Sequence, residues 1–228
     1  MLVYKNMRKE IIQAIIKPYM KSKKFKNKGI LFTKDMGLFQ IEVEIQSQRY
    51  YKEENTENFR INYSLFCREF TELSNRKLGF AGGSIQEEST WIEINSQTDI
   101  ERLKRWLLYE LNSMMDKIEN KYSSEYLLEC WKKYNTDLQY PFLLLKNNPE
   151  RLDEWTSEMK FEIQKLDAKL LELSSEKTEQ EKRNDCLDKE MKLDGIHMKI
   201  NRLVSKKKKI LETLDFIQLN ANKVEKTT

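Results

Sequence analysis

Three carboxylates in the first fifth of the chain are the residues best suited to chemistry. Glu10 lies in a predicted helix, Asp35 in a predicted turn, and Glu44 in a predicted strand with Gln46 two residues on. In Mg²⁺-dependent nucleases two carboxylates hold the metal, and a Lys or Gln nearby positions the attacking water. The order of these residues resembles a degenerate core of that kind. Acids are also expected on the polar side of an alternating strand, and we favour that explanation.

Other kinds of reactive site are poorly represented. The single histidine, His197, lies among heptad residues of a predicted helix, so a Ser-His or Cys-His mechanism is excluded. Zinc needs about four Cys or His ligands, and no such set is present. The three cysteines are scattered, odd in number and without a C-x-x-C pair, which favours a reducing cytoplasm: Cys67, Cys130 and Cys186. We therefore expect no enzyme, no metal and no cofactor.

Alternating residues predict the sheet that would position these side chains. Runs 30–34 and 38–48 flank a short turn at Asp35-Met36-Gly37, and 59–65 repeats the alternation. Residues 91–94 predict a short fourth strand. The polar phase places Glu42, Glu44 and Gln46 near Arg60, Asn62 and Ser64. This surface is either a flat platform for a protein partner or ordinary solvated sheet.

Helices are expected around the sheet. Apolar spacing predicts helices over 5–20 and from about 100 to 120, the latter capped by Ser96 to Asp99 or by Thr98 to Glu101. Ser123-Ser124 opens another helix. Residues 79–83 are predicted to form a glycine loop, and 141–145 a packed connector. The fold class is therefore α+β: an antiparallel sheet of about four strands covered by helices (1–147), followed by a long helical hairpin or coiled coil (148–228).

The last third of the chain carries two heptad seams. They begin after Asn148-Pro149-Glu150, a strong helix start, and are separated by the wholly polar stretch 174–185. The polar stretch is either the tip of an antiparallel hairpin or part of one long helix that needs a second chain. We favour the hairpin, because pairing within one chain avoids the entropy cost of association. The seam residues predicted to bind a partner are Leu166, Leu170, Leu173, Leu193, Ile196, Ile200, Leu203, Ile210 and Leu214.

Two basic groups suggest a polyanion as an alternative partner. The first group consists of Lys21, Lys23, Lys24, Lys26 and Lys28, and the second of Lys206, Lys207, Lys208 and Lys209. Either group could contact the phosphates of DNA or RNA. Solvated surfaces are the commoner explanation, and Lys207 falls on the seam, where a lysine often fixes register or partner choice.

Short motifs at the sheet resemble a bacterial family catalogued as domain of unknown function 4304. The motifs are 25–29 (FKNKG), Phe32, Asp35, Gly37, 45–48 (IQSQ) and 59–62 (FRIN), with 99–101 and 122–124 at the closing helices. The resemblance covers about residues 5–140. Lys23-Lys24-Phe25 departs from the family's more usual Gly-Phe, and the extension after 148 is not part of its pattern. The resemblance implies an α+β domain without an established activity, often encoded near toxin–immunity and phage-defence loci, and it carries over no catalytic residue.

These observations predict a non-enzymatic interaction subunit that docks through its C-terminal helices on a copy of itself or on a different protein. The bacterial defence or immunity setting follows from the resemblance alone. The alternatives are a nucleic-acid-associated subunit and, less favoured, the Mg²⁺ nuclease. The sequence lacks a run of about 20 apolar residues and a secretory signal, so we expect a cytoplasmic protein with no membrane partner.

Overall fold

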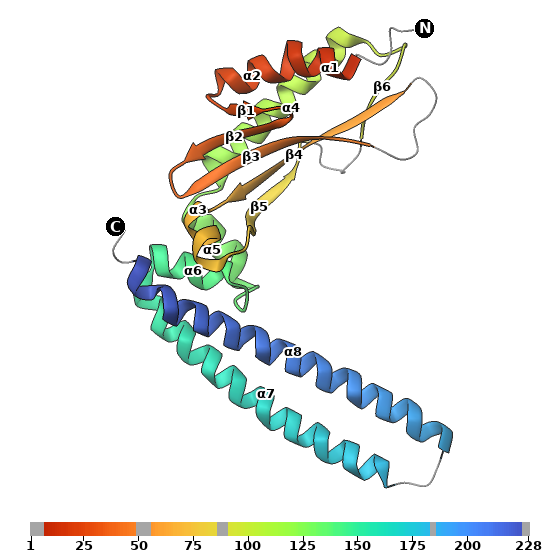
Figure 1. The fold of residues 1–228 in the computed structure, drawn as a ribbon, viewed down its shortest axis with the longest axis vertical. Coiled ribbons are helices and arrows are strands. Elements are labelled where there is room, and N and C mark those ends of the chain that lie inside the picture. Colours follow the sequence, from red (N-terminus) through yellow and green to blue (C-terminus); the bar gives the residue numbers. More distant parts are fainter. Residues whose placement is uncertain (1–6, 49–55, 86–90, 183–185, 225–228) are drawn as a thin grey trace. The chain divides into compact units, whose positions relative to one another are not determined.

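The structure is a computed structural model that describes residues 7–48, 56–85, 91–182 and 186–224 (Figure 1). The chain divides into two compact units, Met1–Ser123 and Ser124–Thr228. We expected the division after residue 147. It comes earlier because the helices between 124 and 147 pack against the long helices that follow them.

The first unit is built on an antiparallel sheet of six strands. The strands are β1 (Lys26–Lys28), β2 (Leu31–Met36), β3 (Phe39–Ser47), β4 (Glu57–Phe66), β5 (Gly79–Ser84) and β6 (Ile92–Ile94). They follow the order β1-β2-β3-β4-β5, and β6 also pairs with β4. The antiparallel α+β fold predicted from the alternation is confirmed, with β1 and β5 added to the predicted strands.

The turn between β2 and β3 forms as the sequence predicts. Gly37 has φ +82°, a left-handed conformation that glycine adopts without steric cost. The Gly37 backbone N–H donates to Asp35 Oδ1 at 3.0 Å, which closes the turn locally. This turn fixes the register in which Thr33 faces Glu42.

The prediction of a loop over 79–83 is wrong, because these residues form strand β5. A Cβ on Gly82 would lie 2.8 Å from the Tyr63 backbone oxygen, and one on Gly83 would lie 3.2 Å from the Tyr63 hydroxyl. The glycines therefore permit a close approach of β5 to β4 that larger residues would prevent.

Three helical segments accompany this sheet in the first unit. The first is continuous: α1 (Met7–Ile11), the π-helical segment η2 (Ile12–Ile16) and α2 (Lys17–Ser22). The wider π turn lies directly before Pro18, whose ring and missing N–H disrupt regular α-helical bonding. The others are α3 (Arg68–Ser74) and α4 (Ile100–Lys121). Asp99 is the N-cap residue of α4, and its Oδ1 accepts from the Arg102 N–H at 3.0 Å. The two capping boxes predicted from the sequence begin at Ser96 and Thr98, so neither begins at the observed cap.

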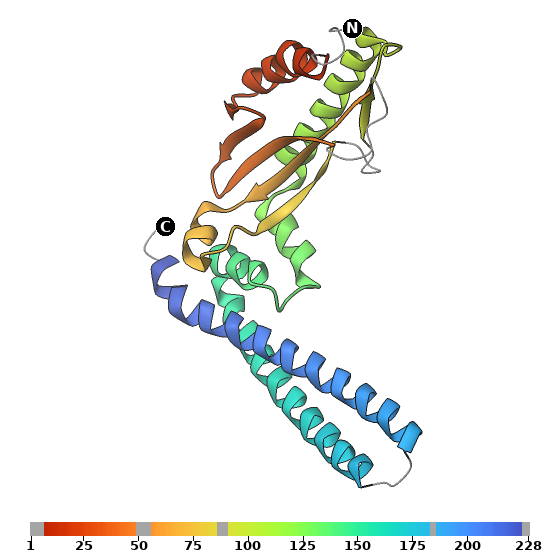
Figure 2. The same cartoon turned by 45° about the vertical axis from the view of Figure 1, so that its right-hand side comes forward.

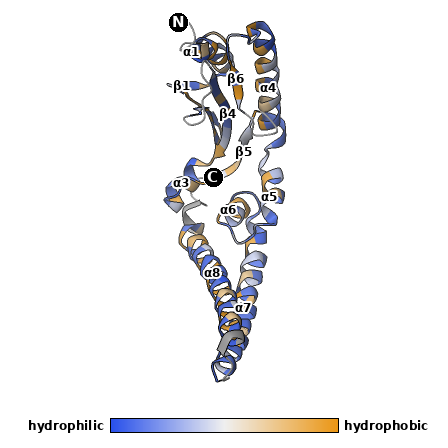
Figure 3. Cartoon of the chain, turned by 90° about the vertical axis from the view of Figure 1, so that its right-hand side faces the viewer, coloured by the Kyte–Doolittle hydropathy of each residue, from blue (hydrophilic) through white to orange (hydrophobic). Residues whose placement is uncertain are grey.

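The core of the first unit lies on one face of the sheet. The first helical segment and α4 pack together over this face (Figures 1 and 3). The Lys34–Glu119 ion pair joins the sheet to α4. The fully buried side chains that fill the space include Phe32, Ile41, Ile45, Phe59, Ile61, Leu107 and Leu111. The opposite face carries the polar phase of the strands.

The second unit is entirely helical in its described part. It contains α5 (Ser124–Lys132), α6 (Gln139–Asn147), the 3₁₀ turn η3 (Pro149–Arg151), α7 (Leu152–Glu181) and α8 (Cys186–Val224). The predicted connector at 141–145 lies inside α6, whose residues 139–145 are all buried. Helices α7 and α8 run side by side as an antiparallel hairpin, which confirms the interpretation favoured from the polar stretch (Figures 1 and 2).

No helix in the described part of the chain is both long enough and apolar enough to span a membrane.

Candidate protein interface

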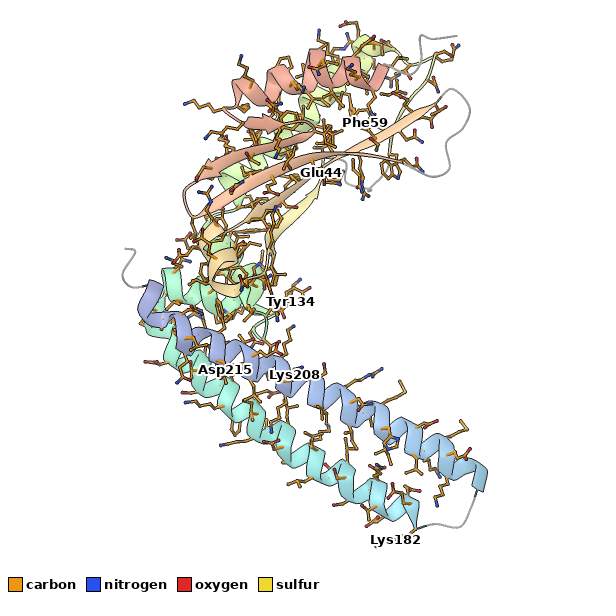
Figure 4. The ribbon with its side chains drawn as sticks, in the orientation of Figure 1. Glu44, Phe59, Tyr134, Lys182, Lys208 and Asp215 are labelled. Atoms are coloured by element: carbon orange, nitrogen blue, oxygen red, sulfur yellow. The ribbon has the colours of Figure 1, made fainter. Side chains whose placement is uncertain are left out.

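The acidic residues that suggested a nuclease are not brought together. Glu10 lies on α1, and the Asp35 carboxylate is engaged in the β2–β3 turn. Asp35 faces Gln40, and Glu44 lies four residues further along β3, about 13 Å away at about 3.3 Å per residue. Figure 4 labels Glu44 on that strand. Within the described residues, no group of three or more His, Cys, Asp or Glu side chains could hold a metal ion.

The polar face of the sheet has the predicted register and satisfies much of its own hydrogen bonding. Gln46 Oε1 accepts from Arg60 Nε at 2.7 Å and from Asn62 Nδ2 at 3.1 Å. Lys77 Nζ lies 2.6 Å from Glu42 Oε2. These side-chain contacts are those expected of a solvated sheet face, and they require no ligand. The role of this face as a platform for a protein partner stays a prediction.

All four lysines at 206–209 lie beside carboxylates. Lys206 Nζ is 2.7 Å from Glu162, and Lys207 Nζ is 2.5 Å from Asp167, so both link α8 to α7. Lys209 pairs with Asp137 in the segment before α6. Lys208, labelled in Figure 4, lies 3.9 Å from Glu212 one turn along α8. The run is therefore matched by acids of the same chain, and its seam member Lys207 is positioned to fix the register of the hairpin.

The first basic group is different. Lys21, Lys24, Lys26 and Lys28 are exposed, and within the described part of the chain these four have no carboxylate partner. Lys23 lies over the Tyr19 ring at 5.8 Å. Lys26 and Lys28 belong to β1, an edge strand of the sheet. Lysines on an edge strand oppose pairing with another sheet, and this role needs no polyanion.

The predicted partner-binding seam is covered within the chain. Of its nine residues, Leu166, Leu173, Ile196 and Ile210 are buried, and Leu170, Leu193, Ile200, Leu203 and Leu214 are half-buried. Helix α8 is thus the companion that α7 requires. Another protein could bind these residues only by opening the hairpin.

The base of the hairpin is anchored by contacts that the sequence analysis missed. Trp155 Nε1 on α7 donates to the Asn135 backbone oxygen at 3.0 Å. Thr213 Oγ1 on α8 lies 3.1 Å from the Thr136 backbone oxygen and 2.8 Å from the Lys209 backbone oxygen, and its single proton can be donated to either. Lys209 pairs with Asp137 in the same segment. One signal could have revealed part of this anchor, since Trp155 is a large apolar residue one helical turn before the seam residue Met159.

The outer surface of the hairpin exposes large apolar residues at some heptad positions and charged residues at others. If seam positions are a and d of a heptad, 100° per residue places e and b on one side of the hairpin, c and g on the other, and f directly outward. Among the side chains that the structure describes in α7 and α8, the exposed large apolar ones occupy b, e or f: Phe161, Leu171, Met191, Met198, Val204, Leu211 and Leu219. The c and g positions include Glu162, Lys165, Lys169, Glu172, Lys199, Arg202 and Lys206. Leu171, Val204 and Leu211 lie on the side of the hairpin formed by b and e, whereas the f residues point outward from their own helix. We call the b, e and f positions together the apolar side of each helix, and the c and g positions the charged side.

No family model, curated protein or solved structure matches the chain. The resemblance to domain of unknown function 4304 therefore stays a prediction. The class of the protein is defined by the fold alone, as an α+β unit joined to a helical hairpin unit.

Proposed function

We propose that the protein is a non-enzymatic interaction subunit that docks on another protein through the apolar side of its hairpin. The observation that carries the proposal is that exposed large apolar residues line the outer face of each helix, five of them in the described part of α8, while the seam between the helices is already filled. Exposed apolar side chains that share one face of a helix, as the e and f residues of α8 do, are typical of protein-binding surfaces.

Helix α8 supplies most of this surface. Met191 is 75% exposed and Met198, one heptad further, is 58% exposed. Val204 and Leu211 are also one heptad apart. Methionine adapts its shape to irregular surfaces, which suits a contact with another protein. Full burial of such a side chain contributes about 1.5–3 kcal/mol, so several partly exposed ones supply a useful binding free energy.

The test is capture of partners by the tagged full-length protein from its native host, followed by mass determination of the complex. The double substitution Met191→Glu, Met198→Glu is expected to release the partner, because it places charges in the buried contact. The matched control Arg202→Glu alters the charged side of the same helix and should keep the partner. Retention of the partner by the double variant, with helical content unchanged, would refute docking through this surface.

The proposed setting, a bacterial defence or toxin-immunity assembly in the cytoplasm, is supported only by the resemblance. Co-purification with a toxin or another defence protein would support it. A partner from an unrelated process would remove it and leave the docking surface in place.

A nucleic-acid-associated role is the second proposal, now limited to the first basic group. The exposed side chains of Lys21, Lys24, Lys26 and Lys28 support it, since these lysines lie on one short segment. We expect binding to a short DNA duplex to weaken steeply between about 50 and 200 mM salt, and to be lost when the four are changed to Glu. Lys206→Gln should leave that binding unchanged, because its charge is matched by Glu162.

A further inference from the structure

Helix α7 carries a second heptad stripe that faces away from the seam. It follows steps of 4, 3, 4, 3, 4 and 3 through Ser157, Phe161, Gln164, Ala168, Leu171, Ser175 and Thr178. All seven residues are exposed, and none is charged. Thirteen of the 30 residues of α7 are charged, so an uncharged stripe along its outward side is unlike an ordinary solvated surface.

The spacing of this stripe is that of a helix-pairing seam. Its largest members are Phe161 and Leu171, which are 57% and 71% exposed. The Lys165 ammonium lies 4.4 Å from the centre of the Phe161 ring, so the chain itself shields only part of that ring. A helix laid along the stripe would cover both side chains and meet small or uncharged residues at the other positions.

We propose that the occupant of this stripe is α7 of a second copy of the chain, packed antiparallel in a two-fold dimer. This inference rests on the proposed function, because the stripe occupies the b and f positions of the apolar side of α7. It identifies a second copy of the chain as one of the proteins that bind there. In the register we propose, Ala168 lies opposite the partner's Leu171, and Gln164 opposite the partner's Ser175. Phe161 then lies opposite the partner's Thr178. Two-fold symmetry repeats each contact, as a self-complementary surface requires.

The charges beside the stripe select this register. Lys165 lies beside the partner's Glu172, and Lys160 beside the partner's Glu181, so two attractive pairs form and symmetry doubles them. Only Glu158 meets a like charge, the partner's Glu179, at the ends of the contact. In a parallel dimer Lys160 would lie beside the partner's Lys165, and Asp167 beside the partner's Glu172. Both parallel contacts are repulsive, so the antiparallel arrangement is favoured.

Two of the residues needed for these pairs are without an ion pair among the described residues, whereas Glu181 already lies 3.7 Å from Lys177 of its own helix. Lys165 and Glu172 are exposed, and neither is in an ion pair in the described part of the chain. Asp167, which meets the uncharged Ser174 of the partner subunit in the antiparallel register, is already paired with Lys207 of its own chain. The proposed dimer therefore leaves the ion pairs between α7 and α8 intact.

The test is sedimentation velocity of the full-length protein over a concentration series, using two single variants and their mixture. Lys165→Glu places Glu beside the partner's Glu172, and Glu172→Lys places Lys beside the partner's Lys165. Each variant alone is expected to raise the dimer dissociation constant about tenfold, because two attractive pairs become repulsive. A 1:1 mixture restores opposite charges at both places and should recover the wild-type dimer.

A second pair of variants separates the stripe from the rest of the hairpin. Leu171→Glu should abolish the dimer, whereas Met191→Glu, at a comparable exposure of 75% on α8, should keep it. Circular dichroism checks that all variants retain their helices. A wild-type monomer at every concentration, or a mixture no stronger than its components, would overturn the proposal, and a stronger dimer in Lys165→Glu would indicate parallel pairing. Capture of a different protein that depends on Met191 and Met198 would survive either result, so the two proposals fail separately.

Discussion

Replacing Gly82 by alanine should destabilise the first unit, whereas the same replacement at Gly195 should stabilise the second. At Gly82 the new Cβ would lie 2.8 Å from the Tyr63 backbone oxygen and 3.3 Å from Ser64 Oγ. Because the closest atom belongs to the backbone of β4, strand β5 must shift by several tenths of an ångström to admit the methyl group. Gly195 lies within α8, and a Cβ added there would meet no atom within 4 Å beyond those of its own helix.

The magnitudes follow from these two environments. Overpacking costs about 1–3 kcal/mol, and the smaller conformational entropy of unfolded alanine offsets about 0.5–1 kcal/mol of that cost. We therefore expect Gly82→Ala to lower the free energy of unfolding by about 0.5–2 kcal/mol. Gly195→Ala should raise it by about 0.5–1 kcal/mol, because alanine is the better helix former and meets no obstacle.

Urea denaturation monitored by circular dichroism measures both changes. The midpoint should fall for Gly82→Ala and rise for Gly195→Ala, with unchanged slopes if only stability is altered. Hydrogen exchange would locate each effect, in β4 and β5 for the first variant and in α8 for the second. A neutral or stabilising Gly82→Ala would show that the close approach of β5 to β4 is not rigid, and would refute the reasoning.

Three further predictions concern single contacts. The hydrogen bond from Lys206 lowers the pKa of Glu162 below its ordinary 4.5, so the pair stabilises the hairpin above that pH and loses its effect as the pH falls through the lowered value. Lys206→Gln should therefore reduce stability at pH 7 by about 0.2–1 kcal/mol and make little difference at pH 2, as urea midpoints would show. Burial, with smaller effects of two nearby carboxylates, raises the pKa of Tyr19 to about 12, so stability linked to its protonation holds below pH 10 and is lost as the pH rises toward 12. An ultraviolet titration should lose its latest-ionising tyrosine in Tyr19→Phe, and an unchanged curve would contradict the assignment. Trp155→Phe should destabilise the second unit by about 0.5–1.5 kcal/mol, because the part-buried Asn135 carbonyl loses its donor, and an unchanged unfolding midpoint would show that this anchor is dispensable.

The sheet and the hairpin were predictable because each leaves a periodic trace in the sequence. Phe39, Ile41, Val43 and Ile45 alternate with polar residues, and all four are buried on one face of β3. The seam residues of α7 and α8 recur at steps of three and four, and they are buried or half-buried as those steps require. Periodicity reports which side of an element is covered, and so it identified these elements correctly.

Strand β5 and the pairing of the lysines were not predictable in the same way. Strand β5 approaches β4 closely because Gly82 and Gly83 have no side chains. Strands are predicted from the pattern of their side chains, so these two glycines give no signal. Lys209 is matched by Asp137, a residue 72 positions earlier in the chain, and no local pattern links the two. The charge that a lysine run offers to a partner depends on such distant contacts, so the sequence overstated the second basic group.

The strand order of the first unit has a consequence for how the chain acquires its structure. Each strand from β2 to β5 pairs with the one made just before it, so β-sheet assembly can keep pace with synthesis and needs no segment still inside the ribosome. Contacts between sequence neighbours also shorten the loops that must close, which favours rapid folding. The sheet is completed only when β6 joins β4, and its apolar face is covered only when α4 has emerged, so the period between β5 and α4 is when the nascent chain most needs protection from aggregation.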